Sequence, residues 1–183
     1  MRETVDPQTV LEEVLMDAYK DEMVAFLESH PEHFQEALDL AAGDRPRYSW
    51  RAAWLMGNCM EDDDSRVRKS VDRLIAAMAG KPDGHWRELM KIVIRMPLDD
   101  EQEGRLFEMA LQQWQDPDKQ SSVRWMAFQF MTKMVGKYPE LAAELKLVLR
   151  FNLIDPLSPG IRRLVVREAK KIFAIKSIFD DAF

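Results

Sequence analysis

Apolar residues recur at intervals of three and four through most of the chain, which is the spacing of one buried face of an α-helix. Val10, Leu11, Val14, Leu15 and Ala18 form the first such stripe. Strict alternation of apolar and polar residues, which would indicate a β-strand, is hard to find anywhere. The pattern therefore predicts an all-α protein with essentially no sheet.

Residues that cap or break helices divide the stripes into predicted helices with short loops between them. Asp6-Pro7 is expected to cap and open the first helix, and Gly43 and Gly80 are expected to end two later ones. Because the loops are short, consecutive helices must pack antiparallel. The later helices are predicted at 23–27, 31–43, 49–60, 65–79, 85–96, 101–115, 122–135, 140–154 and 158–176.

A turn that contains aspartate, followed by an arginine near the start of a helix, occurs four times. The clearest copy joins Asp116-Pro117 to Val123-Arg124, and successive arginines lie 36, 37 and 38 residues apart. A pair of helices cannot bury its apolar faces alone, so a period of this length predicts units that stack on one another. The other copies are Asp44 with Trp50-Arg51, Asp83 with Trp86-Arg87, and Asp155-Pro156 with Ile161-Arg162.

This motif resembles the HEAT repeat of the armadillo-like superfamily. The resemblance implies a right-handed α–α superhelix (solenoid) of about four HEAT-like helical pairs with an N-terminal helical cap. We expect a single domain over 1–183, with the cap at 1–30, the repeats at 31–176 and a C-terminal tail at 177–183. In this superfamily the arginine lies on the second helix of each pair, and the second helices line the concave face.

The resemblance also implies a structural ladder, in which aspartate and arginine side chains of neighbouring units pair with one another. Such a role contributes to stability rather than to catalysis. The implied ladder consists of Asp44, Arg51, Asp83, Arg87, Asp116, Arg124, Asp155 and Arg162.

The composition fits a protein of the reducing cytosol. The only cysteine is Cys59, so no internal disulfide can form, and a buried thiol is its expected state. The first residues contain no apolar stretch typical of a signal peptide, and no apolar run has the length of a membrane span. We therefore expect a cytoplasmic protein that does not bind the membrane.

The net charge of −6 is distributed unevenly between the two helix layers. The predicted first helices carry −11 in total, and the predicted second helices carry +13. A surface lined by one sign of charge attracts partners of the opposite sign. The first helices compared are 31–44, 61–79, 99–116 and 140–155, and the second are 45–60, 81–96, 118–138 and 160–176.

We therefore predict a relatively basic partner-binding surface on the second helices. Its cations recur at helical spacing on single helix faces, and Trp54 and Trp125 are candidates to stack against a partner. For the other tryptophans, burial in the core is expected. An alternative interpretation is that the cations only balance helix dipoles or neighbouring carboxylates. The predicted surface consists of Trp54, Arg87, Lys91, Arg95, Trp125, Lys133, Arg163, Arg167 and Lys170.

Motifs for catalysis, cofactors and metals are missing from the sequence. It contains no Gly-rich phosphate loop and no Gly-x-Ser-x-Gly sequence. His30 and His33 are three residues apart but lack further ligands. We therefore expect no catalytic residue, no cofactor and no bound metal, and we do not expect an enzyme.

Two functions from different classes fit these features. The first is a non-enzymatic scaffold or adaptor that binds an acidic or mixed protein or peptide on its concave face. The alternative is a nucleic-acid-binding protein, because helical-repeat DNA alkylpurine glycosylases, which act in DNA repair, are similar in architecture and use a basic groove. Neither Glu88 nor Glu168 lies beside a matching aromatic set, and the net negative charge disfavours nucleic acid.

Self-association is a third possibility, since residues 1–30 carry −6 and residues 160–176 carry +5.

Overall fold

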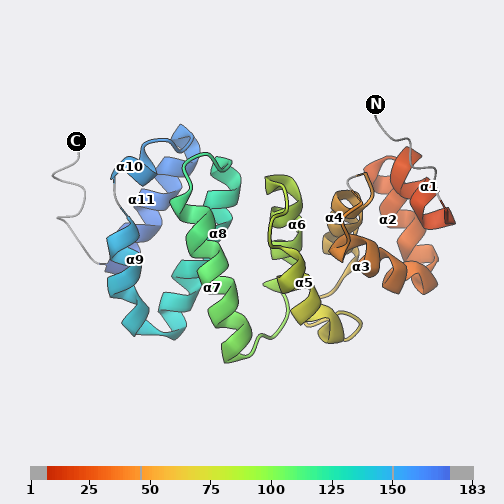
Figure 1. The fold of residues 1–183 in the computed structure, drawn as a ribbon, viewed down its shortest axis with the longest axis horizontal. Coiled ribbons are helices and arrows are strands. Elements are labelled where there is room, and N and C mark those ends of the chain that lie inside the picture. The colour runs from red at the N-terminus through yellow and green to blue at the C-terminus, as the bar shows by residue number, and fades with distance from the viewer. Residues whose placement is uncertain (1–7, 46, 150, 174–183) are drawn as a thin grey trace. The chain divides into compact units, whose positions relative to one another are not determined.

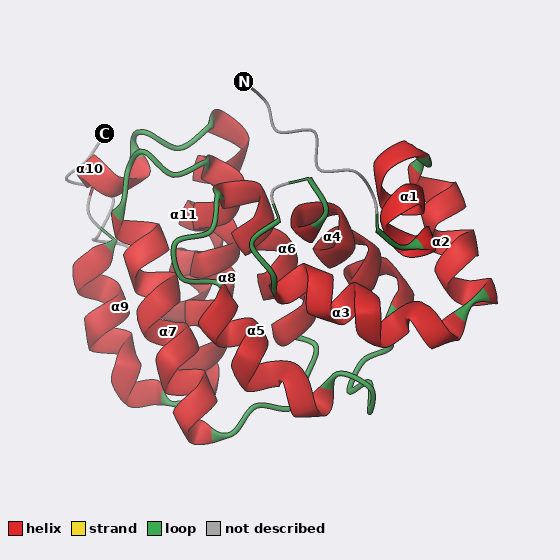
Figure 2. Ribbon diagram, turned by 45° about the vertical axis from the view of Figure 1, so that its right-hand side comes forward, coloured by secondary structure: helices red, strands yellow, loops and turns green. Residues whose placement is uncertain are grey.

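A computed structural model describes residues 8–45, 47–149 and 151–173. Across these ranges the regular structure is α-helix and short 3-10 helix, and they contain no strand (Figure 2). The predicted all-α fold class is therefore confirmed. The chain divides into two compact units, 1–98 and 99–183, which are described separately below.

The N-terminal unit consists of helices that pack in successive pairs (Figure 1). α3 packs against α4, and α4 also lies beside α2 and α6. α5 packs against α3 and α6. First and second helices thus stack on their counterparts, as in a helical repeat. The α-helices of this unit are α1 (Val10–Asp17), α2 (Lys20–Ser29), α3 (Phe34–Ala42), α4 (Ser49–Cys59), α5 (Val71–Ala77) and α6 (Asp83–Val93), with η1 (Pro31–His33) before α3 and η2 (Arg68–Ser70) before α5.

The apolar stripes of the sequence form the core of this unit. Leu11, Leu38, Leu55 and Trp86 come from four different helices and are all buried. Thr9 caps α1 by accepting a hydrogen bond from the Glu12 backbone N–H. The cap predicted at Asp6-Pro7 lies outside the described residues.

One predicted helix of this unit is shorter in the structure. The expected helix at 65–79 is reduced to α5 and a preceding 3-10 turn. Asp63 has a φ of 54°, a left-handed conformation that breaks a helix. The neighbouring Asp64 accepts hydrogen bonds from the backbone N–H groups of Glu61 and Arg66, so it holds a turn that extends into the first residues of the expected helix.

The C-terminal unit is built around two long helices that pack against each other, α7 and α8. α8 also contacts α9 and α11. The rings of Trp114 and Phe128 lie 5.2 Å apart in the core, with Leu145 and Val165 buried as well. Its α-helices are α7 (Asp100–Gln115), α8 (Ser121–Lys137), α9 (Ala142–Val148), α10 (Phe151–Ile154) and α11 (Pro159–Phe173), with η3 (Pro139–Leu141) before α9.

The helix expected at 140–154 is divided in the structure. It consists of η3, α9 and the short α10. The indole N–H of Trp114 donates to the Val148 backbone carbonyl at 2.9 Å, where α9 ends. At the start of the unit, Asp99 and Gln102 form a capping box for α7. The predicted tail at 177–183 lies outside the described residues.

Candidate binding surface

The predicted cations of the N-terminal unit share a buried carboxylate. Glu88 on α6 has its side chain almost fully buried. The Lys91 ammonium donates to its two oxygens at 3.0 and 2.8 Å, and the Arg87 guanidinium donates to one of them at 3.3 Å. Much of the positive charge expected on this face is therefore balanced from within the helix.

Arg95, the third cation of this face, contacts the end of the neighbouring second helix. Its guanidinium donates to the carbonyls of Gly57 and Met60 at 2.8 and 2.7 Å and pairs with Asp62 at 2.6 Å. The Arg95 carbonyl in turn accepts a hydrogen bond from the Asp63 N–H. Arg95 thus satisfies carbonyls at the C-terminus of α4, which have no partner within the helix.

The tryptophans are divided between the core and the surface. Trp86 and Trp114 are fully buried, whereas Trp54 and Trp125 are half-buried. The Lys20 ammonium lies 5.3 Å from the Trp54 ring centre, so the start of α2 covers part of that ring. Trp50 is the most exposed of the five, although it was expected in the core.

Apart from Arg87, which pairs with Glu88, the arginines of the implied ladder contact backbone carbonyls. Arg51 donates to the Ala18 carbonyl at 2.6 Å, at the end of α1. Arg124 is buried and donates to the carbonyls of Trp114, at 3.0 Å, and Leu153. Burial lowers the pKa of Arg124, and the nearby charge of Asp116 acts in the opposite direction.

The aspartates of the implied ladder make other contacts. Asp44 pairs with Lys81, and Asp116 accepts a hydrogen bond from the Asp118 N–H within its own turn. Asp155 pairs with Arg162 at 3.2 Å, also within one turn and helix start. These contacts differ from the implied pairing of aspartate with arginine between neighbouring units. A guanidinium has five donors and can serve several carbonyls at a helix end. Asp116 and Asp155 are satisfied within their own turns, and Asp44 is paired with a lysine of the following turn.

In the C-terminal unit, the predicted cations are exposed and largely unpaired. Among the described residues, the side chains of Lys133 on α8 and of Arg163 and Lys170 on α11 make no ion pair or hydrogen bond. Arg167 pairs with Glu168 at 3.1 Å, but 61% of its side chain stays exposed. α8 and α11 pack against each other, so their cations belong to two neighbouring second helices.

Trp125 completes this part of the surface. It lies on α8 two turns before Lys133, and its ring lies 6.0 Å from that of Phe128. Residues 125, 129 and 133 follow each other at four-residue intervals and share one face of the helix. We call the set Trp125, Lys133, Arg163, Arg167 and Lys170 the basic surface.

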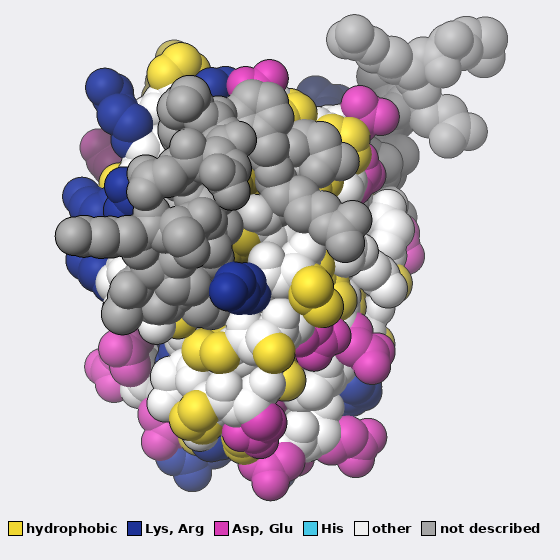
Figure 3. Space-filling view, turned by 90° about the vertical axis from the view of Figure 1, so that its left-hand side faces the viewer, with side chains coloured by type: hydrophobic (Ala, Val, Ile, Leu, Met, Phe, Trp, Pro, Cys, Tyr) yellow, Lys and Arg dark blue, Asp and Glu magenta, His cyan; other side chains and the backbone are white. Residues whose placement is uncertain are grey.

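A space-filling view shows how charge is distributed on one face of the molecule (Figure 3). Lys and Arg side chains gather along its left-hand side, and Asp and Glu side chains lie mainly along its lower and right-hand parts. Hydrophobic side chains reach the surface between them. On this face, positive and negative side chains are therefore unevenly distributed.

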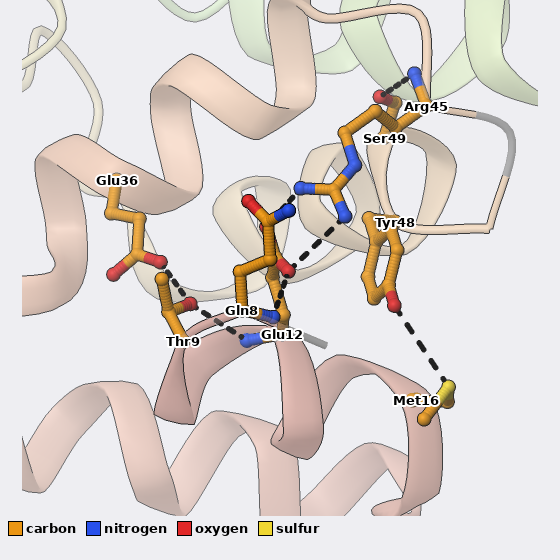
Figure 4. Close-up of polar contacts among 8 residues, drawn as sticks. All are labelled: Gln8, Thr9, Glu12, Met16, Glu36, Arg45, Tyr48 and Ser49. Carbon is orange, nitrogen blue, oxygen red and sulfur yellow. Dashed lines mark hydrogen bonds and ion pairs between the residues drawn. The ribbon is translucent and has the colours of Figure 1, made fainter. Parts of the chain in front are cut away.

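A polar cluster that the sequence did not indicate lies in the N-terminal unit (Figure 4). Glu12 on α1 is buried and pairs with Arg45, in the turn between α3 and α4. Thr9 donates to Glu36 on α3, and Tyr48 donates to the Met16 sulfur at 3.9 Å. These contacts join α1 to the α3–α4 pair. The partners lie 27 to 33 residues apart, beyond the range of any helical pattern.

Other chemistry is limited in the described residues. Burial raises the pKa of Cys59 to about 11, so its thiol is protonated at neutral pH. No group of His, Cys, Asp and Glu in the described ranges is arranged to hold a metal ion. His33 instead contacts Glu36 at 2.8 Å. In the same ranges no helix combines the length and apolarity needed to cross a membrane.

Comparison with known protein families identifies the family of the chain. The model of the HEAT repeat domain family matches residues 8–172, which is most of the chain. Comparison with curated proteins and with solved structures gave no match.

Proposed function

Because the chain belongs to the HEAT repeat domain family, we propose that it is a non-enzymatic scaffold that binds an acidic segment of a protein partner on the basic surface. Proteins of such repeat architecture present extended faces built from successive units, and these faces suit the binding of other proteins. The partner segment lies along α8 and α11. Its carboxylates pair with the arginines and lysines there.

The observation that carries this proposal is the contrast between the two units. On α6, Glu88 already binds Arg87 and Lys91, so these cations have little to gain from a partner. On α8 and α11, Lys133, Arg163 and Lys170 are exposed without a carboxylate partner among the described residues. Concentrated and unpaired charge accelerates association and selects partners of opposite sign.

The proposal is tested by titrating a labelled short polyglutamate peptide into the full chain at low and moderate salt. Reversing Arg163→Glu together with Arg167→Glu should weaken binding about tenfold or more, because exposed ion pairs each contribute about 0.2–1 kcal/mol and the new carboxylates repel the peptide. The matched control is Lys69→Glu with Lys146→Glu. It makes the same charge change at two exposed positions that are not members of the basic surface.

Equal weakening by the control pair would refute a localised surface, since net charge alone would then explain binding. Labelled duplex DNA is titrated in parallel to test the alternative function. Tight DNA binding that falls steeply with salt and is lost in the Arg163/Arg167 variant, with no binding of the peptide, would replace the scaffold proposal by nucleic-acid binding.

A further inference from the structure

We propose that the acidic partner of the basic surface is a second copy of this chain, whose N-terminal helical pair docks on α8 and α11. The inference rests on the proposed function, because it assigns an occupant to the same surface. It follows from the chemistry of the opposite end of the sequence, where α1 and α2 present an acidic and partly apolar face.

The acidic face is formed by side chains that point away from the core of the N-terminal unit. Glu13 and Asp17 on α1, with Asp21 and Glu28 on α2, are exposed and make no ion pair among the described residues. α1 and α2 pack against each other, so the carboxylates belong to one helical pair. The only cation of this pair, Lys20, lies over the Trp54 ring.

Two large apolar side chains of the same helical pair are also exposed. Val10 is 56% exposed and Tyr19 is 82% exposed, the largest value among the exposed large hydrophobic residues of the described chain. Val10 precedes Glu13 by three residues and Asp17 by seven, so the three share one face of α1. Exposed aromatic and aliphatic groups beside charges are typical of protein interfaces, whose centres are apolar and whose rims are polar. We call this set, Val10, Glu13, Asp17, Tyr19, Asp21 and Glu28, the acidic head.

The acidic head and the basic surface are complementary in spacing as well as in charge. Glu13 and Asp17 are four residues apart on α1, and Arg163 and Arg167 are four residues apart on α11. Such pairs have their Cβ atoms about 5–6 Å apart, so one helix crossing the other can form both ion pairs together. Trp125, half-buried on α8, provides an apolar contact for Tyr19 or Val10.

This contact is heterologous, because it joins different surfaces of the two copies. A head-to-tail contact leaves one acidic head and one basic surface free at the ends of a dimer. The assembly therefore grows with protein concentration, or closes into a ring. Because exposed charges are screened, it weakens as salt increases.

The experiment measures the mass of the full chain by light scattering over a range of protein concentrations at low and high salt. The parent chain should associate at low salt and dissociate at high salt. The head variant, Glu13→Lys with Asp17→Lys, and the tail variant, Arg163→Glu with Arg167→Glu, should each remain monomeric. The head variant places lysines opposite the basic surface, and the tail variant places glutamates opposite the acidic head, so like charges meet in both variants.

Mixing the two variants provides the decisive result. The intact acidic head of the tail variant can pair with the intact basic surface of the head variant, so the mixture should recover association. A single chain that carries all four substitutions should recover it as well. The control Glu108→Lys with Glu144→Lys changes the same number of exposed carboxylates on α7 and α9 and should associate like the parent chain.

Failure of this inference is distinguishable from failure of the proposed function. A parent chain that is monomeric at every concentration, or a mixture that stays monomeric, overturns self-docking. The head variant still binds the polyglutamate peptide if the basic surface is a partner site. If the head variant also fails to bind the peptide, the proposed function itself is refuted.

Discussion

At the scale of single residues, Asp64 differs from the neighbouring carboxylates in its burial and in its hydrogen bonds. Residues 61–64 are four consecutive carboxylates, and the sequence does not reveal that Asp64 alone is buried among them. Its two oxygens accept hydrogen bonds from the Arg66 guanidinium at 2.9 and 2.6 Å and from two backbone N–H groups. The sequence shows that a carboxylate stands at this position. Whether its side chain points into the core or into solvent depends on how the rest of the unit packs around it.

These contacts predict a stability change in acid. The hydrogen bonds from Arg66 lower the pKa of Asp64 from 3.8 to about 2, although burial acts in the opposite direction. A carboxyl whose pKa is lower in the folded state stabilises the fold above its unfolded pKa, and this contribution is lost as the pH falls through the folded pKa. We expect about 2 kcal/mol of stability to be lost between roughly pH 4 and pH 2 through this group.

Urea denaturation as a function of pH measures this effect. Asp64→Asn should be less stable than the parent at pH 7 and should show a flatter profile below pH 4, because the substituted group no longer titrates. Asp118→Asn, at an exposed carboxylate, is the control and should follow the parent profile. Parallel profiles for Asp64→Asn and the parent would contradict the role given to Asp64.

At the scale of elements, arginines of the second helices reach the ends of neighbouring helices. Arg51, Arg95 and Arg124 each donate to carbonyls at a helix C-terminus. The sequence predicts the helices and the position of Arg51 and Arg124 in the repeat, because both depend on local spacing. It does not predict the carbonyl acceptors, because these depend on how one helix end meets the next helix.

This arrangement predicts a large stability effect at Arg124. Arg124→Met keeps a similar volume but leaves the carbonyls of Trp114 and Leu153 without their donor. We expect a loss of about 2–4 kcal/mol in the free energy of unfolding, the range for buried polar groups that lose a partner. Chemical denaturation followed by circular dichroism measures it. The control is Arg163→Met, at an exposed position, for which we expect a change within about 0.5 kcal/mol. An equally small change for Arg124→Met would show that water replaces the guanidinium as the donor to these carbonyls.

At the scale of the whole molecule, the separation of charge by helix layer was predictable, but the pairing of charges was not. The sequence assigns net positive charge to the second helices of the N-terminal unit and to those of the C-terminal unit alike. In the structure, Glu88 balances Arg87 and Lys91 in the N-terminal unit, whereas Lys133 and Arg163 remain exposed in the C-terminal unit. Burial of a carboxylate depends on tertiary packing, so a sum of charges along a helix cannot distinguish the two cases. The basic surface as a binding site remains a prediction.

The division into two compact units, 1–98 and 99–183, predicts that stability is distributed locally. In repeat proteins each unit contributes its own stability and that of its contacts with neighbouring units. A substitution in one unit therefore destabilises that unit more than the others. Arg124→Met should therefore increase amide hydrogen exchange in α7 and α8 by about tenfold or more, which corresponds to about 1.4 kcal/mol. The amides of α3 and α4 should change much less. Hydrogen exchange followed by mass spectrometry measures this difference, with Arg163→Met as the control. An equal increase of exchange in both units would mean that the chain unfolds as a single cooperative structure.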